Sequence, residues 1–460
     1  MSCENCNICN NNNNNIVDFS ICSSLLIEIS NICQLACSYC YYQEYQEKNE
    51  QFVNLNEAEI KTQVEKIHKT FPNVDTFQFW GAETMLPTSL KQLRLYIKYI
   101  LENYEKEDIK FFISSNFAYQ KEYITTIKKF FDDINSEAEL KNKKILFFVQ
   151  ASIDFPSYLH NLNRKYKSGK NSYKDCYNFY ITFIKEIMKE NFTNLRILPC
   201  THGTLNYSQI TKNQAYDIPR KILNKYIKDE NLYSKFGLND ISYFPNLCQG
   251  IQYTKEDGEK FLTYLKSYLN YFSELSEKKI IKYGNFTKYL DAQILSFAKG
   301  FLYNNDIGPC GSGTVYAGLD SKNNVYWCHH FFNAPGKERG SYGTLDNINY
   351  ENRTKIYDEI KKYNNFDMFY EEFYSKIYKN KLNISKEETH LSIAKGLYHI
   401  LMKYTCFANN VLHHNQLNYI DFESFYNIIS PEVVKTMILF CEKYKYVFNH
   451  PIVKKDLERC

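Results

Sequence analysis

Residues 31–42 read NICQLACSYCYY and place Cys33, Cys37 and Cys40 on one short loop. Just before them, residues 25–29 read LLIEI, an apolar run that is typical of a buried strand. Three thiolates at this spacing can hold three irons of a four-iron, four-sulfur cluster. Since no fourth cysteine follows in register, one iron stays open to a small molecule. The alternatives are a zinc site, which commonly needs four ligands, and a disulfide knot.

Chain length and charge narrow the class of protein. With 460 residues the chain can form two or three domains, and 56 basic against 52 acidic residues leave a net charge of +4. No basic, aromatic-interleaved patch is evident, so we expect no nucleic-acid partner. The sequence shows neither a signal-peptide pattern nor an apolar run long enough for a bilayer, so we expect no membrane partner and a reducing, cytoplasmic location.

The first residues form a separate segment. Residues 1–20 combine Cys3, Cys6 and Cys9 with six asparagines, Asn10 to Asn15. Low complexity and high polarity predict a flexible tail. Metal binding by its three cysteines is the alternative.

Strand-like and helix-like segments alternate from about residue 24 to about residue 245. The pattern predicts six strands, at residues 25–29, 76–80, 110–114, 145–150, 195–198 and 240–244. It predicts helices at 57–71, which Asn56 would cap, and at 88–101, 121–131 and 173–188. Strands joined by crossover helices favour an α/β fold, a partial (β/α)6 parallel barrel whose ligands bind at the carboxyl ends of the strands.

Polar residues follow these strand ends in order. Glycine at Gly81 lets the chain come close to a ligand, and Glu83 offers a carboxylate to an ammonium group. Ser152 and Asp154 point to one side of their strand and suit ribose hydroxyls. The planar guanidinium of Arg164 suits a carboxylate, with a surface ion pair as the alternative.

The cysteine loop resembles the signature of the radical S-adenosylmethionine (radical SAM) enzymes. That resemblance implies a four-iron, four-sulfur cluster whose open iron binds S-adenosylmethionine, and an electron donor such as flavodoxin or ferredoxin. Residues 81–84, Gly-Ala-Glu-Thr, resemble the family's Gly-Gly-Glu-Pro segment, with Ala82 and Thr84 as departures. This resemblance implies that Gly81, Ala82 and Glu83 bind the methionyl amino group of S-adenosylmethionine.

Three further segments extend the resemblance. Residues 114–116, with Ser115 and Asn116, resemble a Thr-Asn-Gly segment near the nucleoside, and Phe117 in the place of glycine predicts a changed turn; an ordinary polar turn is the alternative. Residues 160–164 resemble the His-Asp-x-x-Arg segment whose arginine pairs with the methionyl carboxylate. Tyr39 stands where the family has an aromatic residue against the adenine, or it packs simply as core.

A second cysteine pair flanks a predicted β-hairpin. Strands at 314–320 and 325–330 are joined by a polar turn; Cys310 precedes the first strand and Cys328 lies toward the end of the second. This arrangement resembles the opening of a SPASM or Twitch extension, with Asn323 in the place of a usual glycine. The resemblance implies at most one auxiliary iron–sulfur cluster, with Cys310, Cys328 and Cys406 as ligands and His329 or His330 as substitutes. The alternative is a hairpin with two thiols and no cluster.

These observations divide the chain into a tail at 1–20, a radical SAM core barrel at 21–245, a SPASM- or Twitch-like extension at 246–345 and a helical region at 346–460. A helix is predicted near 282–299, and apolar residues at helical spacing mark 391–401 and 433–444.

The resemblance implies an oxidoreductase that abstracts hydrogen from a peptide or protein substrate. The result would be oxidation, crosslinking, thioether formation or epimerisation of that substrate. No side chain is singled out as an acid or a base. His329 replaces the aspartate of sulfatase-maturing relatives, which places formylglycine formation in doubt. The alternatives are a Twitch-type small-molecule dehydrogenase or cyclase, a non-catalytic iron–sulfur or zinc protein, and a tRNA-modifying enzyme.

Overall fold

The computed structural model describes residues 17–40, 42, 53–236, 238, 244–248, 251–282, 286–303, 313–332, 334, 336–363, 366–404 and 422–459. The predicted ligands Cys310 and Cys406 and the predicted tail with Cys3, Cys6 and Cys9 lie outside these residues, as does most of the predicted strand at 240–244.

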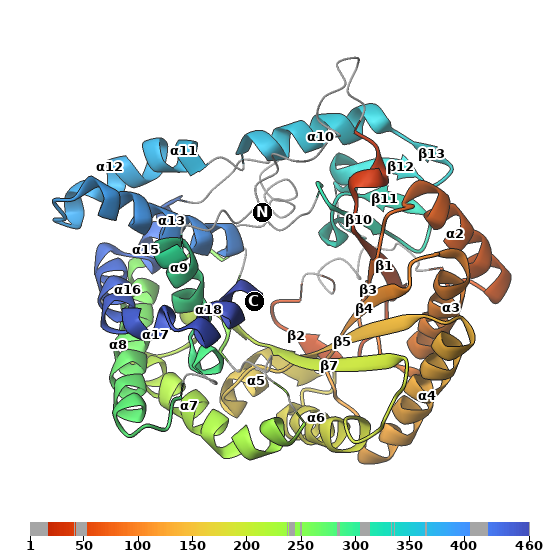
Figure 1. Cartoon of the computed structure of the whole chain (residues 1–460), viewed down its shortest axis with the longest axis horizontal. Coiled ribbons are helices and arrows are strands. Elements are labelled where there is room, and N and C mark those ends of the chain that lie inside the picture. Colours follow the sequence, from red (N-terminus) through yellow and green to blue (C-terminus); the bar gives the residue numbers. More distant parts are fainter. Residues whose placement is uncertain are drawn as a thin grey trace.

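A curved sheet of nine strands lies inside helices α2, α3 and α4 in one half of the molecule (Figure 1). Its order is β13-β12-β11-β10-β1-β3-β4-β5-β7, and the six neighbouring strands from β10 to β7 run parallel. The parallel strands are β1 (Ser24–Ser30), β3 (Thr76–Gly81), β4 (Asp108–Ser115), β5 (Lys144–Ser152), β7 (Leu195–His202) and β10 (Tyr316–Leu319). The partial parallel barrel predicted from the sequence is therefore confirmed.

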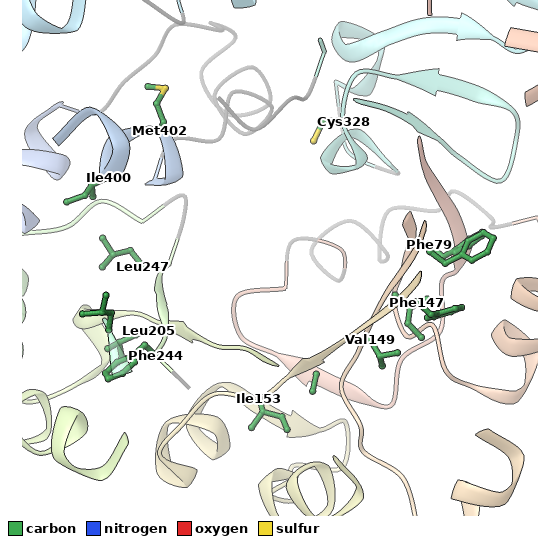
Figure 2. Packing of buried hydrophobic residues seen from close by; sticks show 14 of the residues in the cluster. Phe79, Phe147, Val149, Ile153, Leu205, Phe244, Leu247, Cys328, Ile400 and Met402 are labelled. Carbon is green, nitrogen blue, oxygen red and sulfur yellow. The ribbon is translucent and has the colours of Figure 1, made fainter. Parts of the chain in front are cut away.

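Burial alternates along the strands as a two-residue period requires. In β5, Ile145, Phe147 and Val149 are fully or nearly buried, whereas Gln150 and Ser152 are half-buried on the other face. Figure 2 shows Phe79 and Phe147 on the side of the sheet that faces the outer helices. The second face is thereby left for polar side chains. Strand β1, which pairs with β10 and β3, is buried along its whole length and so on both faces of the sheet.

Helices cover the outer face of the sheet (Figure 1). Helix α2 begins with the predicted cap, since Asn56 accepts a hydrogen bond from the Glu59 N–H and Glu59 bonds back to the Asn56 N–H. The helices of the barrel are α2 (Glu57–Thr70), α3 (Pro87–Asn103), α4 (Ile124–Leu140), α5 (Ser157–Asn163), α6 (Tyr173–Ile187) and α7 (Lys212–Lys235).

The predicted helix at 282–299 is wrong over its first half. The structure has a short 3-10 turn at Thr287–Tyr289, and α9 spans Ala292–Tyr303. The buried carboxylate of Asp291 accepts hydrogen bonds from the N–H groups of Gln293 (2.9 Å) and Ile294 (3.2 Å). Asp291 therefore caps the helix and fixes its start.

The predicted hairpin is confirmed and continues the barrel sheet. Strands β10 and β11 (Asn324–Tyr326) pair antiparallel, followed by β12 (Ser341–Thr344) and β13 (Asn347–Ile348). Asn323 adopts a left-handed backbone with φ 67°, as its place in the turn predicts. Because β10 pairs in parallel with β1, the extension joins the first strand of the barrel directly.

Two pairs of short strands lie outside the main sheet. Strands β2 (Leu35–Cys37) and β6 (Arg164–Tyr166) pair antiparallel, and β8 (Thr204–Leu205) and β9 (Asn246–Leu247) pair parallel. Strand β9 begins just after the predicted sixth strand and pairs with β8, not with β7. The sixth parallel strand of the sheet is instead β10.

Helices of the C-terminal region pack back onto the middle of the chain. Helix α13 packs against α9, and α15 and α16 pack against α8 (Figure 1). None of the helices in the described ranges is both long and apolar enough to cross a membrane. The remaining helices are α8 (Lys255–Glu277), α10 (Tyr350–Tyr363), α11 (Phe366–Phe369), α12 (Ser375–Ile377), α13 (Glu387–Tyr404), α15 (Phe422–Ile428), α16 (Pro431–Lys443), α17 (Lys445–Phe448) and α18 (Pro451–Arg459).

Candidate functional site

One cavity of about 660 Å³ lies at the carboxyl ends of the parallel strands. That volume is in the range of sites for cofactors and small ligands. The three loop cysteines line it together with all the predicted cofactor residues except Asp154, namely Tyr39, Gly81, Ala82, Glu83, Ser115, Asn116, Ser152 and Arg164. The segments that the sequence placed at strand ends therefore meet at one site.

The cysteine loop is fixed to the barrel wall by the small β2/β6 ladder. Within it, Cys37 lies directly opposite Arg164. The Ser38 N–H donates to the Asn163 carbonyl (2.8 Å) and the Lys167 N–H donates to the Gln34 carbonyl (3.1 Å), which extends the pairing at both ends. The loop is therefore held by the segment that carries the predicted arginine.

The three thiols lie in a partly buried and electrostatically uneven environment. Cys33, Cys37 and Cys40 are each half-buried and form no disulfide. Burial raises the pKa of Cys33 to about 12, to which the neighbouring Glu83 contributes. Burial also raises the pKa of Cys37 to about 11, although the positive charge of Arg164 opposes that rise. Cys33 accepts hydrogen bonds from the Leu35 N–H and the Asn116 amide, each at 3.4 Å.

Gly81 and Glu83 form a tight turn at the end of β3. Gly81 has φ 138°, and a Cβ atom there would lie 2.1 Å from the Ser30 carbonyl oxygen, so only glycine fits. The Glu83 carboxylate is buried and accepts hydrogen bonds from the N–H groups of Met85 (3.0 Å) and Asn116 (2.8 Å) and from the Tyr119 hydroxyl (2.8 Å). Burial raises the pKa of Glu83 against the effect of these donors. Glu83 therefore ties the ends of β3 and β4 together while it lines the cavity.

The turn after β4 contains an unusual backbone conformation. Phe117, in the place of a glycine, adopts a left-handed backbone, φ 57°. Its fully buried ring packs edge-on against Tyr180 (5.5 Å) and Phe183 (5.4 Å). This packing offsets the strain of about 1–2 kcal/mol that a left-handed backbone costs a residue with a Cβ atom.

Asp154 and Arg164 form a buried ion pair beside the cavity. The Arg164 Nε donates to Asp154 Oδ2 at 3.0 Å, and the Tyr39 hydroxyl donates to the same oxygen. The Thr204 N–H donates to Asp154 Oδ1 at 2.9 Å. Both carboxylate oxygens are thus engaged, and Asp154 is 1% exposed, so it supports the wall of the site, whereas Ser152 faces the cavity.

Tyr39 and His160 complete this buried group. The Arg164 guanidinium lies 5.1 Å from the centre of the Tyr39 ring, a cation–π geometry. His160 Nδ1 accepts from the Asp154 N–H at 3.3 Å, and its Nε2 lies 3.0 Å from the Ser172 hydroxyl, which itself donates to the Arg164 carbonyl. Burial lowers the pKa of His160 to about 4, so its ring is neutral near pH 7. The ring holds Asp154 and Arg164 in place from behind.

The extension supplies two imidazoles to the same cavity. His329 stacks on Trp80 of β3, with ring centres 4.3 Å apart and planes 18° apart, and His330 lies beside it at 4.6 Å. Cys328, the residue before His329, is buried, and Figure 2 shows it next to the strands of the hairpin. Burial lowers the pKa of His329 well below its usual range. The hairpin predicted as a second site therefore also forms part of the first.

Polar residues of the later strands also face the cavity. His202, Thr204, Asn246 and Cys248 all line it, and the Asn246 amide lies 3.4 Å from His202 Nδ1. Burial lowers the pKa of His202.

Sequence reasoning missed several lining residues. Leu247 and Ile400 both line the cavity although their segments are far apart in sequence, and Figure 2 shows both side chains. Trp80 could have been found from the strand period, because it alternates with buried residues. Helices α9 and α13 approach from distant parts of the chain, which leaves no local signal. The missed residues are Tyr42, Trp80, Leu247, Ala292, Gln293, Ser296 and Ile400.

The fold and the site together define a class of protein. Residues 27–190 match the profile described as Radical SAM superfamily, so this part of the chain has the sequence pattern of a radical SAM domain. The matched segment runs from β1 to the end of α6 and includes the cysteine loop and Arg164.

Two solved structures resemble nearly the whole chain. A hexahistidine-tagged form of anSMEcpe, an anaerobic sulfatase-maturating enzyme, with bound AdoMet is 16% identical with a TM-score of 0.51, over 93% of this chain and 98% of that chain. The native form with bound AdoMet is 16% identical with a TM-score of 0.52, over 90% of this chain and 99% of that chain. At this identity the likeness shows the fold. No curated protein matches the sequence.

The residues present fit the cofactors of the family, a four-iron, four-sulfur cluster and S-adenosylmethionine. Three thiols on one loop line the cavity, and N–H groups already point at the Cys33 sulfur, as they do at cluster thiolates. In the described part of the chain, no three His, Cys, Asp or Glu side chains gather about one point as a single metal ion needs. A cubane binds each cysteine at a different iron, so its thiolates need not meet at one point.

Proposed function

We propose that this chain is a radical SAM enzyme that abstracts hydrogen from a peptide or protein substrate, leading to oxidation, crosslinking, thioether formation or epimerisation. The observation that carries the proposal is the convergence on one cavity of the loop cysteines, the polar strand ends of the barrel and the histidines of the extension.

The residues divide by their chemistry. Cys33, Cys37 and Cys40 would hold the cluster. Around them, Gly81, Ala82, Glu83, Ser115, Asn116, Ser152 and Arg164 would hold S-adenosylmethionine, with Tyr39 against its adenine. When bound, this cofactor pair supplies reductive cleavage of S-adenosylmethionine and an adenosyl radical, driven by a donor such as flavodoxin or ferredoxin. The barrel wall orients the reactants and excludes water.

Asp154 takes a supporting part in this proposal. Because its oxygens are bonded to Tyr39, Arg164 and Thr204, we assign it to holding Arg164, not to a ribose contact. The bond from Arg164 to Asp154 is through Nε, and the guanidinium also forms a side-chain hydrogen bond with Cys37. Its other N–H groups would serve the methionyl carboxylate.

The extension supports the choice of a peptide substrate. Its hairpin resembles the SPASM or Twitch opening of peptide-modifying enzymes, and His329 and His330 bring it to the cavity. A Twitch-type dehydrogenase or cyclase acting on a small molecule is the second candidate, because the single auxiliary cluster that the hairpin implies fits such an enzyme at least as well.

We further propose one auxiliary iron–sulfur cluster with Cys310, Cys328 and Cys406 as ligands. Cys328 is buried next to His329, which could substitute for a cysteine. Iron and sulfide counting on wild type and Cys310→Ala tests this assignment. A fall in iron is expected, and an unchanged iron content would remove the auxiliary cluster.

The main experiment follows deoxyadenosine release by anaerobically reconstituted, dithionite-reduced protein. Wild type should cleave S-adenosylmethionine. Each of the variants Cys33→Ala, Cys37→Ala and Cys40→Ala should lose most of the iron bound at this site and should not cleave S-adenosylmethionine. Cys441→Ala, a buried thiol in α16, is the matched control and should retain both. Intact S-adenosylmethionine with a fully loaded wild type would contradict the proposal and favour a non-catalytic protein.

A second experiment separates the two substrate classes. Candidate peptides and small metabolites are supplied in parallel, and deoxyadenosine release coupled to product is measured. Coupling to a peptide supports the first candidate, and coupling to a metabolite alone overturns it in favour of the second.

A further inference from the structure

The Cys33 sulfur is the meeting point of two N–H donors. The Leu35 backbone N–H lies 3.4 Å from Cys33 Sγ, and the Asn116 Nδ2 lies at the same distance. Asn116 is only 6% exposed and comes from the turn after β4, far from the cysteine loop in sequence. A side chain from the barrel wall therefore reaches a predicted cluster ligand.

The Asn116 amide is held in this orientation by its other end. Its Oδ1 accepts from the Ala118 N–H (2.8 Å) and from the Gln34 side-chain amide (3.1 Å). Exchanging the amide oxygen and nitrogen would set the nitrogen against two donors, so the Nδ2 group must face the sulfur.

The backbone around Asn116 is shaped for this contact. The left-handed Phe117 closes the turn in which Asn116 Oδ1 receives the Ala118 N–H, and the buried Phe117 ring fixes that turn. Gln34, the neighbour of Cys33, also donates to the Ala118 carbonyl at 3.2 Å. The turn and the cysteine loop are thus joined as one unit.

The three cysteine sulfurs differ in the hydrogen-bond donors and charges around them. Cys33 receives two N–H groups and Cys37 faces the Arg164 cation. For the Cys40 sulfur, no donor lies within hydrogen-bonding distance in the described residues. Side chains of the barrel therefore contact some of the predicted cluster ligands and not others.

From this geometry we propose that Asn116 is a positioning residue for the cluster: its amide N–H holds the Cys33 sulfur and raises the reduction potential. A hydrogen bond to a thiolate draws off negative charge and so favours the reduced cluster, and such bonds are among the factors that set cluster potentials. The inference rests on the cluster assigned above but not on any substrate.

The test compares two serine variants at matched asparagines. Asn116→Ser keeps a hydroxyl acceptor for the Ala118 N–H but is too short to reach Cys33. Asn246→Ser shortens an amide that lines the same cavity and contacts His202 instead. The midpoint potential of each reconstituted protein is measured by electron paramagnetic resonance during a redox titration without S-adenosylmethionine, alongside iron counting.

We expect Asn116→Ser to load iron fully and to show a more negative midpoint potential than wild type, whereas Asn246→Ser shows the wild-type value. Asn116→Leu, which keeps the side-chain bulk without a donor, should shift in the same direction. An unchanged potential at full loading overturns the proposal. So does failure of both Asn116 variants to bind iron, because the amide then builds the loop and does not tune the cluster.

This outcome is separable from the proposed function. A wild type that holds its cluster but turns over no peptide leaves the potential measurement intact. A wild type without iron removes the cofactor assignment itself.

Discussion

Cys37 and Arg164 lie directly opposite each other in the antiparallel ladder of β2 and β6. The ladder joins the cysteine loop to the segment that follows α5, so the positions of a predicted cluster ligand and a predicted carboxylate-binding arginine depend on one another. Their backbone coupling makes the loop and the arginine one structural unit.

Replacing Arg164 should strongly destabilise the protein before any cofactor binds. Asp154 is 1% exposed, and Arg164→Met would leave its carboxylate buried without its cation. Removing one partner of a buried pair typically costs about 3–5 kcal/mol of unfolding free energy. Urea denaturation of the apoprotein measures the loss.

The control is the double variant that combines Arg164→Met with Asp154→Asn. Because neither partner then carries a buried charge, the double variant should recover a large part of the lost unfolding free energy. A loss below about 1 kcal/mol for Arg164→Met would instead be typical of an exposed pair.

The sequence predicted those parts of the site that lie on consecutive strands. The strand ends carry Glu83, Asn116 and Ser152 in order, and a parallel sheet must bring such ends to one edge. The cysteine spacing fixed the chemistry independently of the fold. Both kinds of signal are local, which is why they could be read from one chain.

Other features depend on contacts between distant segments and carry no local signal. The pairing of β10 with β1 and the approach of Ile400 to the cavity are of this kind. Phe117 shows the same limit, because its left-handed backbone is tolerated through burial against Tyr180 and Phe183.

Two long helices were missed although their starts are marked. Thr211 with Gln214 begins α7 and Thr254 with Asp257 begins α8, and each pair forms a capping box. The pattern of a hydroxyl residue followed three positions later by an acidic or amide residue would have indicated both.

Gly81→Ala should cost more stability than the same change at Gly169. Both glycines have positive φ, 138° and 81°, but a Cβ at Gly81 meets the Ser30 backbone whereas one at Gly169 meets nothing within 4 Å. Gly169→Ala should therefore cost about 1–2 kcal/mol for the backbone alone. Gly81→Ala should cost about 1–3 kcal/mol more, since the neighbouring backbone cannot yield easily.

Paired denaturation curves check this ordering. Equal losses at the two positions would show that the close approach of β3 to β1 at Ser30 is not maintained in solution.

His160 should make stability depend on pH in the acidic range. Its folded pKa of about 4 lies below the ordinary 6.5, chiefly because burial disfavours the cation. Between these values the unfolded chain binds the extra proton, so stability is fully present above pH 6.5 and declines as the pH falls toward 4. The decline attributable to this ring from pH 7 to pH 5 is about 2 kcal/mol.

His160→Asn isolates that contribution, because its amide can accept the Asp154 N–H but does not titrate in this range. Unfolding free energies at pH 7 and pH 5 should differ by about 2 kcal/mol less in the variant than in wild type. The same pH dependence in both proteins would mean that the ring is protonated readily in the folded state.

The stacking of His329 on Trp80 should couple the extension energetically to the barrel. The two rings lie 4.3 Å apart and nearly parallel, and Trp80 also stacks on Phe112 of β4, so the imidazole extends a stack that begins in the sheet. Aromatic pairs of this kind contribute about 0.5–1.5 kcal/mol beyond their buried area. A double-mutant cycle of Trp80→Leu and His329→Leu should show a coupling energy in that range.

The matched cycle of Trp80→Leu with Phe332→Leu is the control. Phe332 lies in the same turn but packs against Tyr326, so the effects of these two changes should be additive. Additivity in the first cycle would mean that the hairpin does not dock on the barrel through this pair, and the cavity would then lose its histidine wall.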